Sequence, residues 1–190
     1  PLEMSEQQTL DRLVAMLAKV PIAKVAQHKL SSGEKQAMKK AYTEFVKELK
    51  DTGTTYGIHK PDTDASIEEL LLTLKPMGYK VILIDYISLL KGVDDDEQWK
   101  KLGAIARYAK IFAETTNTIV ILLAQVSDDG VIRYARSIAE HANNAWLWTA
   151  SREQEDISIY DVTQLKARNQ SIFGFQLQNE NAYGLVSDVD

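Results

Sequence analysis

The stretch Val81–Leu90, VILIDYISLL, runs four aliphatic residues into an aspartate and then returns to apolar sequence. A short run of this kind is typical of a strand covered on both faces, as in a parallel sheet flanked by helices. Asp85 is then expected at the carboxyl end of the strand, where open α/β sheets bind ligands. Because an ionised carboxylate is costly to bury without a partner or a metal, we interpret Asp85 either as a functional residue or as the cap of the following turn.

A second aliphatic run, TIVILLAQ at residues 118–125, follows a helical pattern of apolar residues. That pattern consists of Leu102, Ile105, Ala106, Ala109, Phe112 and Ala113. Strand, helix and strand at this spacing form a βαβ unit, in which the two strands are parallel. Asp85 and Gln125 are therefore expected to end neighbouring strands at one edge of the sheet.

Further elements are predicted on both sides of this unit. Upstream, helices are expected from Ser5, from Ser31 or Ser32 to Gly53, and within residues 64–78, with a short strand at 54–60. Downstream, a short helix is expected at 134–142, and then strands at 145–150, 157–167, 171–178 and 182–186. The fold class is thus α/β, with a mostly parallel sheet, flanking helices and a β-rich, antiparallel last third.

The totals limit the classes of protein that fit. A chain of 190 residues can bury one core, so residues 1–190 are interpreted as a single domain. The 22 Lys+Arg against 27 Asp+Glu give a net charge of −5, which argues against a surface that coats nucleic acid generally. The sequence has no Cys, so disulfides and thiolate zinc sites are excluded. No apolar run suits a membrane span and no signal-peptide pattern opens the chain, so a soluble, cytoplasmic protein is expected.

An aspartate that ends a buried strand after four aliphatics is also the Walker B pattern of nucleotide motors. The segments PLEMS, VILIDYISLL, ILLAQVSDDG, RSIAEHANNAWLW and LKARNQ occur in the order and rough spacing of the DnaB-like replicative helicases. The chain resembles that family, and its bacteriophage members in particular, over essentially its whole length. The resemblance implies a RecA-like motor domain that unwinds duplex DNA by ATP-driven translocation on single-stranded DNA. It also implies ATP and Mg²⁺ as cofactors, a ring of six subunits, a primase or helicase loader as partner, and the cytoplasm, or a host's cytoplasm, as location.

The resemblance assigns roles to three polar residues near the predicted sheet. Glu3, in PLEMS, matches the catalytic glutamate that orients the water attacking the γ-phosphate. Asp85 matches the Mg²⁺-linked aspartate, and Gln125 matches the residue that couples the state of the phosphate to the DNA-facing loop. The alternatives are an exposed residue near a helix start for Glu3 and a residue that satisfies loose backbone groups for Gln125.

Two cations in LKARN form a second candidate group. Lys166 and Arg168 are two residues apart, so on a strand they point to the same side. In DnaB-like rings the matching residues reach the nucleotide of the neighbouring subunit, and the arginine stabilises charge in the transition state. This role requires an oligomer. The alternative is a solvated basic face.

The segment from Val126 to Ser137 matches the loop that faces the translocating DNA strand. Arg133 and Arg136 are its cations and are candidates to bind phosphates. However, Ser127, Asp128 and Asp129 follow the glutamine, and the two aspartates would repel phosphate. A plain solvated loop is the alternative. The acidic residues 94–97 are interpreted as solvated surface rather than a calcium site, because they lack the spaced ligands of an EF-hand.

No G-x-x-x-x-G-K-[ST] motif occurs in the sequence, so the loop that holds the β- and γ-phosphates is missing. The chain is therefore expected to be the C-terminal part of a motor domain without its P-loop strand and helix, and to hydrolyse ATP poorly alone. An apolar edge of its sheet is expected to be exposed or to be covered by another chain. Two other functions stay open: another RecA-like ATPase of recombinase or clock-protein type, and a non-catalytic assembly module.

Overall fold

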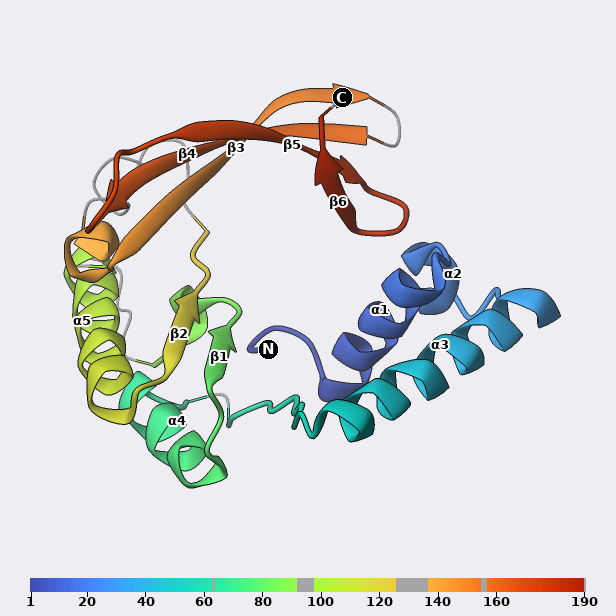
Figure 1. Ribbon diagram of the computed structural model, residues 1–190, viewed down its shortest axis with the longest axis horizontal. Coiled ribbons are helices and arrows are strands. Elements are labelled where there is room, and N and C mark those ends of the chain that lie inside the picture. Colours follow the sequence, from blue (N-terminus) through green and yellow to red (C-terminus); the bar gives the residue numbers. More distant parts are fainter. Residues whose placement is uncertain (63, 92–97, 126–136, 155–156, 190) are drawn as a thin grey trace. The chain divides into compact units, whose positions relative to one another are not determined.

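The computed structural model describes residues 1–190 except residues 63, 92–97, 126–136, 155–156 and 190 (Figure 1). The chain divides into two compact units. The first contains Pro1–Ser5, His59–Leu147 and Gln164–Phe173, and the second contains Glu6–Ile58, Trp148–Thr163 and Gly174–Asp190. Strands β3 (Asn144–Gln154) and β4 (Ile157–Ala167) have residues in both units.

A parallel pair of strands lies at the centre of the first unit. Strand β1 (Val81–Ile84) pairs with β2 (Ile119–Leu122) in a register that runs from Val81 opposite Ile119 to Ile84 opposite Leu122. Helix α5 (Gln98–Thr116) lies between them in the sequence. The predicted βαβ unit is confirmed, because β1 and β2 are parallel and α5 forms the crossover that joins them.

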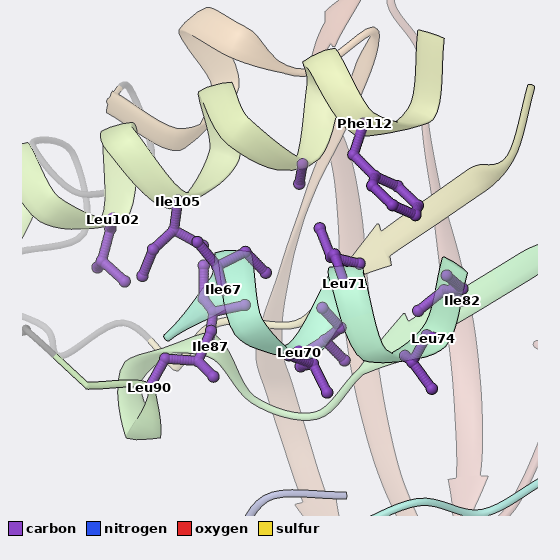
Figure 2. Packing of buried hydrophobic residues seen from close by; sticks show 12 residues of the cluster. Ile67, Leu70, Leu71, Leu74, Ile82, Ile87, Leu90, Leu102, Ile105 and Phe112 are labelled. Carbon is purple, nitrogen blue, oxygen red and sulfur yellow. The ribbon is translucent and has the colours of Figure 1, made fainter. Parts of the chain in front are cut away.

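The core of this unit is formed by α4 (Ile67–Leu74), α5 and the buried side of β1 (Figure 2). Helix α4 begins at a capping box, in which Ser66 accepts from the Glu69 backbone N–H and the Glu69 carboxylate accepts from the Ser66 N–H. Two 3₁₀ turns follow, at Lys75–Met77 and at Ile87–Leu89. The buried cluster consists of Ile67, Leu70, Leu71, Leu74, Ile82, Ile84, Ile87, Leu90, Leu102, Ile105, Ala109 and Phe112.

Two neighbouring leucines of α4 differ sharply in exposure, and their truncation is expected to differ accordingly. Leu71 is fully buried (0% exposed), whereas Leu72 is 56% exposed. Replacing Leu71 by Ala is expected to lower the free energy of unfolding by about 2–5 kcal/mol, because it leaves a cavity. The same change at Leu72 is expected to alter it by less than about 0.5 kcal/mol. Urea denaturation followed by circular dichroism measures both, and equal losses would contradict this packing.

The other face of the parallel strands is apolar and exposed. Val81 and Leu83 of β1 are 52% and 54% exposed, and Ile119 and Ile121 of β2 are 61% and 41% exposed. Within the described part of the chain, β1 and β2 pair with no further strand. The strands are therefore covered on one face, and the expectation of strands covered on both faces is wrong. The exposed apolar surface is a face of this pair, whereas the sequence predicted an apolar edge.

Three helices begin the second unit: α1 (Glu6–Ala18), α2 (Ile22–Ala26) and α3 (Ser32–Thr52). Ser31 and Glu34 form a capping box at the start of α3, and Gly53 ends it with φ +65°, a conformation that favours glycine. The pKa of the Glu34 carboxyl is lowered to about 2. The largest cause is a hydrogen bond from Lys24, and the hydrogen bonds from Ser31 contribute less. The helix predicted from Ser31 or Ser32 to Gly53 is confirmed as α3. The strand predicted at 54–60 is wrong, because this segment pairs with no other strand.

The last third forms a four-stranded sheet in the order β3-β4-β5-β6, where β5 is Gly174–Glu180 and β6 is Leu185–Asp188. Strand β4 has the predicted bounds. It is antiparallel to β5, with Ile157 opposite Glu180, and β5 is antiparallel to β6, with Leu177 opposite Asp188. The antiparallel prediction is confirmed for these pairs, although β5 and β6 each begin three residues later than expected.

Candidate active site

Asp85 directly follows β1 and is exposed to solvent. The premise that this carboxylate is buried is therefore wrong. Because the polypeptide leaves the sheet after Ile84, the side chain lies at the carboxyl end of the strand and not among the aliphatic residues before it. An exposed carboxylate carries little desolvation penalty and is free to meet a charged ligand.

Glu3 is brought to the same strand end by a backbone hydrogen bond. The Leu2 N–H donates to the Asp85 carbonyl at 2.7 Å, and the Leu2 side chain packs against the buried cluster. The Glu3 carbonyl accepts from Lys60 Nζ at 3.5 Å, while its carboxylate is exposed. Glu3 thus directly follows Leu2, whose N–H pairs with the Asp85 carbonyl. In the sequence, Glu3 and Asp85 are 82 positions apart.

Gln125 reaches the same edge from β2. The parallel ladder continues past the strands, since the Leu123 N–H donates to the Ile84 carbonyl at 3.0 Å and the Ile87 N–H donates to the Leu123 carbonyl at 2.9 Å. Gln125 follows two residues later and is exposed. The structure therefore collects the predicted Glu3, Asp85 and Gln125 at the carboxyl end of one pair of parallel strands.

The chemistry of these three side chains suits a hydrated, hard cation and a phosphate. Two carboxylates and an amide offer oxygen ligands, and Mg²⁺ is usually held by one or two carboxylates together with waters and phosphate oxygens. The described residues contain no cluster of three or more acidic or histidine side chains that could hold a metal by itself. The donor set therefore fits Mg²⁺ that arrives with a nucleotide better than a permanent metal centre.

Lys166, near the end of β4, is engaged with its own chain. Its ammonium donates to the Ala139 carbonyl at 2.9 Å and to the Glu140 carbonyl at 2.7 Å. These carbonyls lie at the end of the helix formed by residues 137–141. The lysine thus has two acceptors within the first unit.

Arg168 lies one residue past β4 and is exposed. Its Nη1 is 3.9 Å from Glu114 Oε1 on α5, and Glu114 also pairs with Lys110 at 2.8 Å. The hydrogen bond from Lys110 and its charge, with a smaller effect of Arg168, lower the pKa of the Glu114 carboxyl. The tighter partner of Glu114 is Lys110, so the guanidinium of Arg168 keeps most of its donors available.

The position of Arg168 relative to the sheet follows from connectivity. Helix α5 runs from the carboxyl end of β1 to the amino end of β2, and Glu114 lies in its last turn. Arg168 is therefore at the end of the parallel strands opposite to Asp85 and Gln125. An arginine at that end cannot act on a phosphate beside Asp85 of its own subunit.

Arg133 and Arg136, predicted to contact DNA, lie outside the described residues, as do the acidic residues 94–97. Sequence reasoning missed the partners of the predicted cations. The pair Lys110 and Glu114 has the spacing of an i,i+4 ion pair on a helix and could have been found. The carbonyls that bind Lys166 could not, because a backbone acceptor 26 or 27 residues away leaves no signal in the sequence.

A cavity of about 400 Å³ lies within the second unit. It is lined by Glu6, Gln7, Leu10, Tyr42, Phe45, Val46, Leu49, Tyr56 and Ile58. None of the predicted site residues is among them. Across the described ranges, none of the helices has the length and apolar character that a membrane span requires.

Comparison with known proteins gives a family and a fold. The family described as DnaB-like helicase C terminal domain matches residues 1–136. No curated protein matches the chain. A solved structure described as an ATPase domain is similar, with a TM-score of 0.80 at 17% identity, over 99% of this chain and 72% of that chain. A DnaB-like replicative helicase, described with its interactions with primase, has a TM-score of 0.79 at 17% identity, over 99% of this chain and 50% of that one.

Proposed function

The chain belongs to the family of DnaB-like helicase C-terminal domains, and from this premise we propose that the full-length protein is an ATP-driven replicative DNA helicase. The observation that carries the proposal is the gathering of Glu3, Asp85 and Gln125 at the carboxyl end of β1 and β2. Ligands bind at this edge in open α/β sheets. The RecA-like fold, shared with the solved ATPase domain, supports the same reading.

Each of the three residues has a distinct task in the proposed reaction. Glu3 orients a water molecule against the γ-phosphorus of ATP and accepts its proton as the bond to the leaving ADP oxygen breaks. Asp85 holds Mg²⁺ through its carboxylate, directly or through water, and the ion supplies neutralisation of phosphate charge when it is bound. Gln125 donates to the γ-phosphate, so its position depends on whether that phosphate is present.

Arg168 is proposed to act on the nucleotide of the neighbouring subunit. Its place at the end of the parallel strands opposite to Asp85 supports action on another subunit, and its exposure leaves the guanidinium accessible. An arginine that stabilises charge in the transition state from a neighbouring subunit is a common device of phosphoryl-transfer enzymes. The proposal therefore includes an oligomer, and we propose a ring of six subunits.

The remaining parts of the proposal concern the whole protein. The sequence has no P-loop motif, so we propose that the full-length protein carries one elsewhere. Residues 1–190 are proposed to work as one motor domain, because β3 and β4 have residues in both compact units. Arg133 and Arg136 are proposed to contact single-stranded DNA. A primase or a helicase loader is the proposed protein partner, since one similar structure is described with its interactions with primase.

The test is a strand-separation assay with the full-length protein on a forked DNA duplex. We expect unwinding that requires ATP and Mg²⁺ and stops with a non-hydrolysable ATP analogue. Hydrolysis accompanied by filament formation and strand exchange, without unwinding, would replace the proposal with a recombinase. A full-length protein that binds no nucleotide in a fluorescent-ATP titration would instead be an assembly module.

A further inference from the structure

A small network of charged side chains lies at the last turn of α5, within the first unit. The Glu114 carboxylate pairs with Lys110 of the same helix at 2.8 Å and lies 3.9 Å from Arg168 Nη1. Lys110 also donates to the side-chain oxygen of Asn143, the residue before β3. The proposed finger is therefore within ion-pair distance of an acidic group of its own subunit.

The two cations hold the carboxylate unequally. The Lys110 side chain is only 19% exposed and has Asn143 as a second partner, so it is fixed beside Glu114. The Arg168 side chain is 61% exposed, and its distance is that of a charge pair without a hydrogen bond. Because Lys110 offsets much of the charge of Glu114, the carboxylate attracts the guanidinium only weakly. Arg168 is thus held loosely.

This loose pair has a consequence for the proposed reaction. A carboxylate and a phosphate compete for the same N–H donors of a guanidinium. A carboxylate that stayed beside the arginine would also repel the phosphate. The pair between Glu114 and Arg168 therefore has to open when Arg168 reaches the nucleotide of the neighbouring subunit. Any stabilisation of the pair lowers the fraction of Arg168 that is available to the nucleotide.

We propose that Glu114 restrains Arg168 on its own subunit, and that Lys110, by pairing with the carboxylate itself, keeps this restraint weak. The inference rests on the proposed role of Arg168 as a finger and adds a regulation of that role. The restraint ends when the neighbouring nucleotide binds the guanidinium. Glu114 and Lys110 thus set the availability of the finger without touching the nucleotide.

The experiment compares Glu114→Gln and Lys110→Met in the full-length protein with Glu68→Gln, a control at an exposed glutamate of α4. Glu114→Gln should raise kcat for ATP hydrolysis about two- to fivefold, the range that one exposed ion pair supports, because the amide carries no charge. Lys110→Met should lower kcat by a similar factor, because it leaves the carboxylate to Arg168. KM should stay unchanged, since a finger acts in the transition state. Glu68→Gln should keep the wild-type kcat.

Combined variants show whether these effects pass through Arg168. In the Arg168→Ala background, Glu114→Gln and Lys110→Met should each leave the residual rate unchanged, because no finger is present to restrain. Changes of the same size in both backgrounds would overturn the inference. An unchanged kcat in the single variant Glu114→Gln would also overturn it. A lower kcat in that variant would do the same, because Glu114 would then support the finger.

A readout that needs no hydrolysis separates this inference from the proposed function. Phenylglyoxal modifies accessible guanidinium groups, and mass spectrometry of the peptides reports the rate at Arg168 and, as an internal reference, at the exposed Arg12 of α1. The rate at Arg168 should rise in Glu114→Gln and fall in Lys110→Met, while the rate at Arg12 stays constant. These shifts are expected whether or not the protein unwinds DNA. Equal rates at Arg168 in all variants would show that Glu114 does not restrain it.

Discussion

In the full-length protein, the change Arg168→Ala is expected to lower the rate of ATP hydrolysis by about 10³-fold or more, the usual contribution of an arginine finger. The rate of hydrolysis should fall without a loss of folding stability. Arg168 is exposed and its pair with Glu114, at 3.9 Å, is a long surface contact that contributes little to folding. Arg107→Ala, which removes an exposed arginine of α5, is the matched control and should leave hydrolysis near the wild-type rate. Steady-state phosphate release measures both.

Mixed rings decide whether Arg168 acts on a neighbouring subunit. Arg168→Ala and Asp85→Asn subunits are each expected to be nearly inactive alone. In a mixed ring, an interface that receives Arg168 from one variant and Asp85 from the other has a complete site. We therefore expect the mixture to hydrolyse ATP faster than either variant alone. If Arg168 served its own subunit, no site in the mixture would be complete and no activity would return.

The elements that the sequence predicts correctly are those whose signals are local. The aliphatic runs of β1 and β2, the helix start at Ser31 or Ser32 and the stop at Gly53 each depend on residues within one or two turns. The strand predicted at 54–60 fails for the opposite reason. Its residues favour an extended chain, but a strand also needs a neighbour with which to pair, and this segment has none.

In the candidate site, too, the contacts with a local signal could be predicted and those without one could not. Parallel pairing of two predicted strands is sufficient to bring Asp85 and Gln125 to one edge, so their proximity follows from the pattern. The bond between Leu2 and the Asp85 carbonyl, which brings Glu3 there, joins residues 83 positions apart and has no local signal. The exposure of Asp85 was misjudged because the apolar residues on both sides suggested a fully buried run, although one side of β1 is open.

The family resemblance assigns Lys166 to the neighbouring nucleotide, and the structure shows its ammonium donating to two carbonyls of its own chain. A motif match places residues in order along a sequence, but it cannot show which of two reachable acceptors a long, flexible cation binds.

The change Asp85→Asn is expected to lower ATP hydrolysis by the full-length protein by about 10²–10³-fold, because it removes the negative charge that holds Mg²⁺ beside the phosphates. The asparagine keeps the shape of the side chain and keeps the backbone carbonyl that accepts from Leu2 at 2.7 Å. The free energy of unfolding should therefore change by less than about 0.5 kcal/mol. Asp64→Asn, at another exposed position of the first unit, is the control and should keep full activity.

The dependence on Mg²⁺ separates this explanation from a general disturbance of the site. If Asp85 holds the ion, then the neutral amide is a weaker ligand, and the Mg²⁺ concentration that gives half-maximal hydrolysis should rise in Asp85→Asn. Excess Mg²⁺ should recover part of the lost rate. In Arg168→Ala, by contrast, the half-maximal Mg²⁺ concentration should stay near the wild-type value, because a guanidinium has no acceptor with which to bind the ion. Identical Mg²⁺ titrations for Asp85→Asn and the wild type would remove Asp85 from the metal site and leave it as the cap of the turn that follows β1.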